Sequence, residues 1–183
     1  LSNSGMITSN YWLSEVYDAQ ITNAHKNGDL YIHNINMLTG CSAGWSLEDL
    51  ILKGLPSVNK MISSLPAKHL STLCNQMVNF LGIMQNEWAS AQSFAHFDTL
   101  LVPFIHQDKL SVKMVSDCLE SFIYGINIPS RWGTQAPFSQ ITLDWNVPQE
   151  FINKKAIVAG CECDFTYGDC QKEMKILHDA LFE

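Results

Sequence analysis

The segment from Ala67 to about Trp88 carries the strongest structural signal in the sequence. Its apolar residues recur at the i, i+3, i+4, i+7 spacing that lines one face of an α-helix: Leu70, Leu73, Cys74, Met77, Val78, Leu81 and Met84. The polar side of this pattern carries few charges. The segment therefore predicts a long helix that is contacted on more than one side.

Shorter elements are predicted on both sides of this helix. Helical spacing and capping residues mark five further helices: from Asn10 to Gly28, from Ser46 to about Lys53, from Phe94 to Pro103, from Ser111 to about Tyr124, and from Asp169 to the end. Strands are predicted at 30–33, 139–145 and 156–159. Many helices with a few short, separated strands indicate a helix-rich α/β fold that forms part of a larger α/β body.

Composition limits the kinds of partner. Charged residues make up 16% of the chain, against about 25% in an ordinary soluble domain. Part of the surface is therefore expected to be covered by more of the same chain or by another subunit. The formal net charge is −7 without a basic run, which argues against binding a nucleic-acid backbone. Small phosphorylated ligands stay possible, because helix N-termini and backbone amides can hold them.

The cysteines and the two ends of the chain bear on its cellular compartment and on whether it belongs to a longer protein. No run of about 18 apolar residues predicts a membrane span, and no secretory signal is visible. The six cysteines are therefore expected to be reduced thiols of a cytoplasmic protein. Because Leu1 is not methionine and the helical pattern at Glu183 has no cap, residues 1–183 are expected to be a single segment of a longer protein.

One tract near the end has enough ligand types for zinc, namely Cys161 and Cys163 with Cys170 and His178. Its spacing matches no usual zinc finger or ribbon. Ordinary reduced thiols near a helix start are the favoured interpretation, and no metal site is predicted in the chain.

Two loops carry candidate chemistry. Cys41 lies in "GCSAGWSL", between two glycines, after a predicted strand and before a predicted helix N-terminus that favours anions. From these residues alone, a tolerated loop cysteine is the simpler interpretation. In the proline-fixed loop 125–138, Ser130, Arg131 and Gln135 are suited to hold a ribose or a phosphate, although such loops also serve as plain connectors.

Several long motifs, taken together, resemble one family, the anaerobic (class III) ribonucleoside-triphosphate reductases, which are glycyl-radical enzymes. The motifs are "GDLYIHNINMLTGCSAGWSLEDLILKGL", "PAKHLSTLCNQMVNFLGIMQNEWASAQSFAHFDTLLVPFI" and "INIPSRWGTQAPFSQITLDWNVP", and "DFTYGDCQKEMKIL" extends the match. The resemblance covers nearly all of the chain from about Asn10 onward.

The resemblance implies a ten-stranded α/β barrel, of which residues 1–183 would be the N-terminal part. It implies oxygen-independent reduction of ribonucleoside triphosphates to deoxyribonucleoside triphosphates for DNA synthesis. In that family a glycyl radical, generated by an S-adenosylmethionine iron–sulfur activase, produces a thiyl radical that abstracts the 3′ hydrogen of the ribose. The radical glycine, the thiyl cysteine and a structural zinc site would lie beyond Glu183, so the segment alone is expected to be inactive.

The resemblance also assigns roles to residues of the chain. By position, Cys41 matches a second cysteine, which gives hydrogen to the 2′ carbon as water leaves. His33, Ser42, Ser130 and Gln135 match the substrate side, with Gln135 in a G-x-Q-x-P-F element.

The helix at 67–88 resembles the region that forms a homodimer and its effector site for ATP or a deoxynucleotide. Gln76, Asn79 and Gln85 are the predicted effector contacts.

The chain departs from the family pattern at two places. Tyr31, Ile32, His33 and Asn34 stand where the family often has H-x-H-D, and Cys41 stands one place earlier than the family cysteine, whose place Ser42 holds. Two alternatives therefore stay open: a non-catalytic, nucleotide-sensing relative, and another glycyl-radical enzyme of the formate-lyase type. The sequence does not decide whether formate or a thioredoxin-like protein is the reductant.

Overall fold

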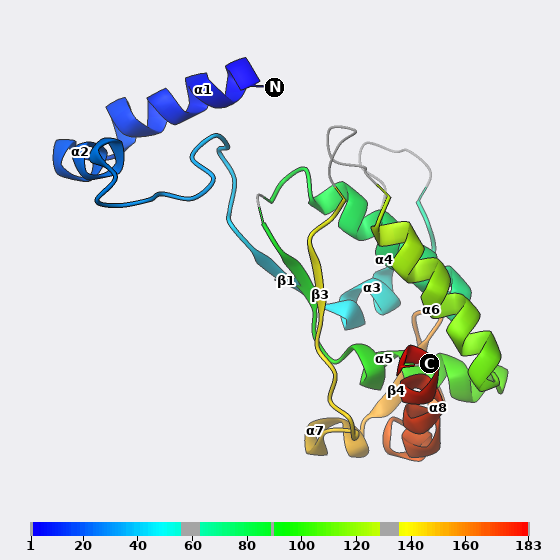
Figure 1. Cartoon of the computed structure of the whole chain (residues 1–183). Coiled ribbons are helices and arrows are strands. Elements are labelled where there is room, and N and C mark those ends of the chain that lie inside the picture. Colours follow the sequence, from blue (N-terminus) through cyan, green and yellow to red (C-terminus); the bar gives the residue numbers. More distant parts are fainter. Residues whose placement is uncertain (1, 56–62, 89, 129–135, 183) are drawn as a thin grey trace.

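The structure is a computed structural model that describes residues 2–55, 63–88, 90–128 and 136–182. In chain order its elements are α1 (Ser2–Tyr11), the π-helical turn η1 (Trp12–Val16), α2 (Ala19–Asn27), β1 (Ala43–Trp45), α3 (Leu47–Lys53), α4 (Leu70–Met84), β2 (Gln92–Phe94), α5 (Phe97–Asp108), α6 (Val112–Ile126), β3 (Ser139–Ile141), α7 (Gln149–Ile152), β4 (Lys155–Val158), β5 (Cys161–Thr166), the 3₁₀ turn η2 (Gly168–Cys170) and α8 (Gln171–Phe182). This composition confirms the predicted helix-rich α/β fold (Figure 1).

Three short parallel strands form the sheet, in the order β1–β2–β3. The connection from β1 to β2 contains α3 and α4, and the connection from β2 to β3 contains α5 and α6, as parallel pairing requires a crossover. Trp45 and Phe94 lie side by side in the register and both contact Phe80 on α4. One face of the sheet is therefore covered by α4.

The predicted long helix is α4, and its apolar face is buried as expected. Burial of each such side chain contributes about 1.5–3 kcal/mol to stability. A Cβ on Gly125 of α6 would lie 2.7 Å from Val78 of α4, so a glycine lets these two helices approach closely. The helix is shorter than predicted, because His69 is already extended (ψ 152°) and Gln85 ends the helical hydrogen bonding.

The predicted helix from Asn10 to Gly28 is broken. Tyr17 is extended (ψ 144°), and the carboxylate of Asp18 accepts a hydrogen bond from the backbone N–H of Ile21 at 2.9 Å, which starts the new helix α2. Gly28 ends α2 in the left-handed conformation (φ 85°), as predicted.

The strand predicted at 30–33 is absent, and this part of the prediction was wrong. The segment is largely exposed and leads into a turn at Asn34 (φ 54°). An apolar–polar pattern alone does not make a strand when no neighbouring strand offers hydrogen bonds.

The helix predicted over 94–103 is present, but both of its bounds were wrong. Phe94 belongs to β2, where its backbone pairs with Trp45 and Ile141. The helix α5 starts at Phe97 and continues through Pro103 to Asp108. An internal proline costs about 3 kcal/mol, but every residue of α5 from Phe97 to Ile105 is buried, and that packing outweighs the loss.

The C-terminal part contains a hairpin and a helix. The strand predicted at 156–159 is β4, and it pairs antiparallel with β5 across Ala159 and Gly160, whose φ angles of 56° and 76° suit a two-residue hairpin turn. Cys161 and Cys163 therefore lie on a strand instead of near a helix start. The predicted final helix is α8.

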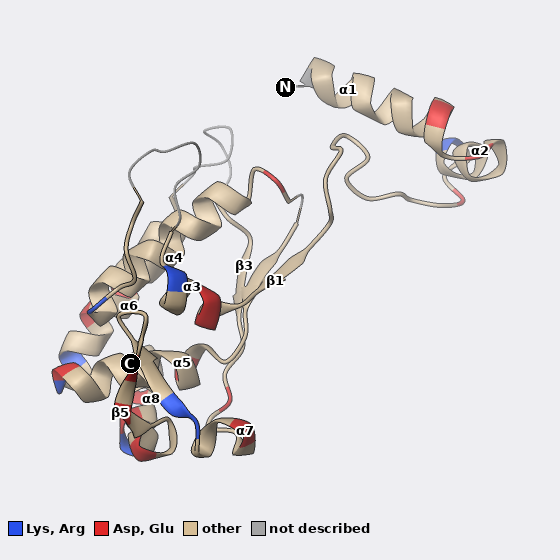
Figure 2. Ribbon diagram, turned by 180° about the vertical axis from the view of Figure 1, so that it is seen from behind, with Lys and Arg blue, Asp and Glu red and all other residues tan. Residues whose placement is uncertain are grey.

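The N-terminal elements α1, η1 and α2 form an arm that extends away from the rest of the chain (Figure 1). Figure 2 shows few charges on this arm, and α1 carries none. Met6, Ile7 and Tyr31 are 65%, 70% and 71% exposed. Within the described residues, no helix combines the length and the apolar character needed to cross a lipid bilayer.

Candidate active site

The backbone before β1 is held by the loop that precedes β2. Gly40 forms a parallel bridge with Trp88, and a Cβ at Gly40 would overlap the Trp88 ring. The Trp88 ring in turn meets the Trp45 ring edge-on, with centroids 5.8 Å apart. A side chain at position 40 would therefore point toward the rings of Trp88 and Trp45, on the side of the sheet that α4 covers.

The pairing steps by one residue between Gly40 and Ala43. Ala43 is three residues after Gly40, but its partner Gln92 is four residues after Trp88. The carbonyl of Cys41 accepts from the N–H of Ser90 at 2.6 Å, and Ala43 donates to the carbonyl of Ala91 at 3.0 Å. The extra residue of this step is on the side of residues 88–92, opposite the segment that contains Cys41 and Ser42.

Ser42 lies two residues before Gly44, and Cys41 is its neighbour in the chain. Successive side chains of an extended chain alternate between faces. Because Trp45 faces α4, Gly44 and Ser42 lie on the opposite side of the sheet. Ser42 Oγ lies 3.9 Å from Cys41 Sγ and both side chains are exposed, so the thiol adjoins this opposite side.

The surroundings of Cys41 differ from the prediction of a flexible loop beside a helix N-terminus. The segment is pinned by backbone hydrogen bonds to residues 90–91, and β1 separates it from α3. Ser46 caps α3, with its hydroxyl accepting from the N–H of Asp49 at 3.1 Å. The partial positive charge of α3 therefore falls on residues 46–49 and does not reach Cys41.

The face of the sheet opposite α4 carries no helix among the described residues (Figure 1). Its central row is Gly44, Ser93 and Gln140, which are in register across β1, β2 and β3. These residues are polar or lack a side chain, and the three strands carry no charged residue, as Figure 2 shows for β1 and β3. We call this surface the open face.

The other predicted substrate residues lie elsewhere. His33 is exposed in a turn of the N-terminal arm, and its ring meets Tyr31 edge-on with centroids 4.8 Å apart. In the described part of the chain, no hydrogen bond or ring contact joins His33 to Cys41. Ser130 and Gln135 lie outside the described residues.

The predicted effector residues do not share one surface. Gln76 is 3% exposed, and its Nε2 donates to Ser64 Oγ at 2.8 Å and to the Leu65 carbonyl at 2.6 Å. Gln85 is also buried, whereas Asn79 is exposed. Of the three, only Asn79 offers its side chain to solvent.

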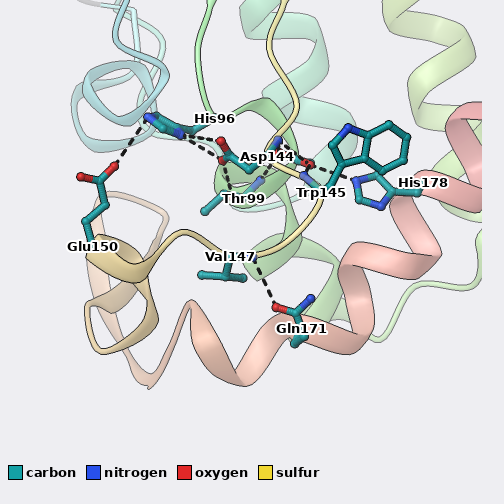
Figure 3. Close-up of polar contacts among 9 residues, drawn as sticks. His96, Thr99, Asp144, Trp145, Val147, Glu150, Gln171 and His178 are labelled. Carbon is teal, nitrogen blue, oxygen red and sulfur yellow. Dashed lines mark hydrogen bonds and ion pairs between the residues drawn. The ribbon is translucent and has the colours of Figure 1, made fainter.

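A second polar centre was missed by the sequence analysis and lies where β2 and β3 end (Figure 3). The buried carboxylate of Asp98 accepts hydrogen bonds from the backbone N–H groups of Thr99, Asp144 and Trp145, each at 2.9 Å, and pairs with His178 Nε2 at 2.9 Å. A buried charge needs this many partners to be tolerated.

Asp144 extends the same centre toward the surface. It pairs with His96 Nδ1 at 2.9 Å and accepts from Thr99 Oγ1 at 2.6 Å, and His96 Nε2 lies 4.0 Å from Glu150. His96 and Trp145 have left-handed backbones, with φ angles of 54° and 66°. Because both carboxylates are hydrogen-bonded to groups of the protein, this centre fastens the end of the sheet to α5 and α8. The sequence signal was an aspartate inside an otherwise apolar helical run.

The thiols differ sharply in their surroundings. All six cysteines are free, and Cys41 and Cys161 are exposed. Burial raises the pKa of Cys74 to about 12 and the pKa of Cys170 to about 12. His178, weighed above as a ligand beside the cysteines, is engaged with Asp98 instead. No group of three potential ligands for a metal ion occurs among the described residues.

Comparison with known proteins connects this geometry to one family. A family model described as anaerobic ribonucleoside-triphosphate reductase matches residues 1–183. None of the curated proteins matches.

Solved structures share the fold. The anaerobic ribonucleotide reductase from Thermotoga maritima in complex with dATP and CTP is 18% identical with a TM-score of 0.73, covering 97% of this chain and 32% of that chain. The same enzyme with dATP bound in the specificity site is 19% identical with a TM-score of 0.75, and the match covers 97% of this chain and 33% of that chain. Another structure, described as an anaerobic ribonucleotide reductase, is 22% identical with a TM-score of 0.74, and the match covers 97% of this chain and 30% of that chain. The chain thus spans about a third of the length of these proteins.

Proposed function

The chain belongs to the anaerobic ribonucleoside-triphosphate reductase family, and on this premise we propose that the protein containing it reduces ribonucleoside triphosphates to deoxyribonucleoside triphosphates without oxygen. Residues 1–183 then form the N-terminal part of its catalytic domain, a ten-stranded barrel. The observation that carries the proposal is the exposed Cys41 thiol, held beside Ser42 just before the first strand of a parallel sheet.

In this proposal Cys41 donates hydrogen to the 2′ carbon of the ribose. Replacing the 2′ hydroxyl by hydrogen consumes two electrons and two protons and releases water. The thiol supplies one hydrogen atom because its S–H bond is weak. Over the whole turnover a reductant, formate or a thioredoxin-like protein, supplies both electrons, with protons from the reductant and from solvent, and the Cys41 thiol is restored. Backbone hydrogen bonds at Cys41 and Ala43 hold the segment that carries the thiol, so its backbone is positioned before substrate arrives.

The family's other requirements are proposed to lie outside residues 1–183. The glycyl radical, made by an S-adenosylmethionine iron–sulfur activating enzyme, supplies the unpaired electron for the chemistry. A structural zinc site is expected in the same outer part of the protein.

Regulation and assembly complete the proposal. ATP or deoxynucleotide effectors bind on the α4 side, with Asn79 as the available contact, and the protein is a cytoplasmic homodimer. Support for the effector comes from the Thermotoga maritima enzyme, which has dATP in a specificity site. Support for a covering subunit comes from the exposed apolar side chains of the N-terminal arm, such as Met6 and Ile7.

An anaerobic assay of the full-length, activated protein tests this function. Formation of deoxyribonucleotides from ribonucleoside triphosphates is expected, with no cleavage of pyruvate. Pyruvate cleavage without nucleotide reduction would place the protein with the formate-lyase type. Nucleotide binding without any turnover in the activated protein would instead support a sensing relative.

A further inference from the structure

The open face has an unusual character for a parallel sheet. Parallel sheets in α/β proteins are normally covered on both faces, so their strands read as continuous apolar runs. Here the apolar residues Trp45, Phe94 and Ile141 all face α4, and the opposite row is Gly44, Ser93 and Gln140. The open face is therefore built to meet polar groups and not a second apolar layer.

Two side chains of this row are available for a ligand. Ser93 is half-buried and Gln140 is exposed, and neither side chain hydrogen-bonds to any residue in the described ranges. Gly44 keeps the space beside Ser93 clear, since a Cβ on Gly44 would lie 3.6 Å from Ser93 Oγ.

The available groups lie close to Cys41 and Ser42. Ser42 precedes Gly44 by two residues on the same face, a rise of about 7 Å, and neighbouring strands are about 4.8 Å apart. Ser93 therefore lies about 8 Å from Ser42 across the sheet surface, and Gln140 lies one strand farther away. A nucleotide placed with its ribose at Cys41 extends over this row.

The chemistry of the row favours one part of a nucleotide. A hydroxyl and a carboxamide both donate and accept hydrogen bonds, which suits sugar hydroxyls and the edge of a base. The strands provide no cation for a triphosphate. We propose that Ser93 and Gln140 are substrate-positioning residues, which hydrogen-bond to the ribose or base of the ribonucleoside triphosphate presented to Cys41. This inference rests on the function proposed above.

The test uses the activated full-length enzyme with CTP as substrate and the single variants Ser93→Ala and Gln140→Leu. The loss of one hydrogen bond to the substrate is expected to raise KM for CTP about tenfold in each variant. Ser139→Ala is the matched control, because Ser139 faces the other side of the sheet and donates to the Pro137 carbonyl at 3.3 Å. Its KM is expected to stay unchanged.

A binding measurement separates this inference from the proposed function. In a Cys41→Ala background, calorimetry of CTP is expected to show the same tenfold weakening for Ser93→Ala and Gln140→Leu. Unchanged CTP affinity and unchanged KM in both variants, at unaltered thermal stability, would overturn the inference while leaving the reductase function standing. A wild type without reductase activity would overturn the proposed function, and the binding comparison would still decide whether these side chains hold a nucleotide. If Ser93→Ala is unstable, Ser93→Thr, which keeps the hydroxyl, must restore wild-type affinity, and failure to do so counts against the inference.

Discussion

His178 on α8 donates from Nε2 to the buried carboxylate of Asp98 at 2.9 Å, across 80 residues of chain. The pair is almost completely shielded from solvent, with side-chain exposures of 13% and 0%. Through it the last helix is tied to the start of α5 and to the backbone that leaves β3 at Trp145. This pair joins α8, α5 and the segment after β3, and so it holds the end of the sheet in place.

Replacing His178 by alanine is expected to destabilise the protein by about 3 kcal/mol, because the buried carboxylate of Asp98 loses a hydrogen-bond partner. Thermal unfolding of the full-length protein measures the effect. His69→Ala is the control, since His69 pairs with Asp108 at the same 2.9 Å but is 64% exposed. An exposed pair contributes about 0–1 kcal/mol. Equal shifts in the two variants would contradict the role given to the Asp98 centre.

Thiol alkylation should separate the cysteines by burial. A thiol reacts as its thiolate, so a pKa raised to about 12 leaves Cys74 and Cys170 almost unreactive at pH 8, and their reactivity rises with pH. Cys41 and Cys161 are exposed and are expected to react with iodoacetamide under native conditions. Mass spectrometry of the native and the denatured protein gives the comparison. Equally fast modification of Cys74 and Cys41 in the native protein would show that α4 is not packed as described.

The close contact between the backbone before β1 and Trp88 can be probed at Gly40. Because a Cβ there overlaps the Trp88 ring, Gly40→Ala is expected to cost about 1–3 kcal/mol and to reduce turnover by moving Cys41. Trimming the ring in a Gly40→Ala/Trp88→Leu double variant should recover part of the turnover. Gly44→Ala is the stability control, since its Cβ would make only an ordinary contact with Ser93. Wild-type stability and turnover of Gly40→Ala would rule out the proposed constraint.

Variants at two positions of α4, Asn79 and Gln76, can distinguish an effect on effector binding from an effect on the stability of the fold. A saturating deoxynucleoside triphosphate is expected to raise the melting temperature of the full-length protein, by about 2.7 kcal/mol of stabilisation at 100 times the Kd. Asn79→Ala should reduce this ligand-induced shift without changing the melting temperature of the free protein. Gln76→Ala should do the reverse, because Gln76 holds the segment at Ser64 and Leu65. An unchanged ligand shift in Asn79→Ala would remove Asn79 from the effector site.

The sequence predicted best the elements whose stability is local. The apolar spacing from Leu70 to Leu81 identifies α4, and Ser111 caps α6 with its own hydroxyl, which accepts from the N–H of Met114. Periodicity and caps lie within a few residues of the element that they define, so they can be read without knowing the fold.

The missed features depend on contacts between distant residues. The strand β2 has three residues and exists through pairing with Ala43 and Ser139, which lie 49 and 47 positions from Gln92. Gln76 occupies a polar position of α4 but is buried because residues 64–65 fold over it. The open face itself depends on the register that aligns Gly44, Ser93 and Gln140, which alternation read along the sequence does not reveal.

Turnover of Cys41→Ala in the activated full-length enzyme tests the central claim most directly. The account predicts that deoxyribonucleotide formation is lost while the fold and nucleotide binding are retained, and that Cys161→Ala, which removes the other exposed thiol, keeps wild-type turnover. Full turnover by Cys41→Ala would show that this thiol is not the hydrogen donor.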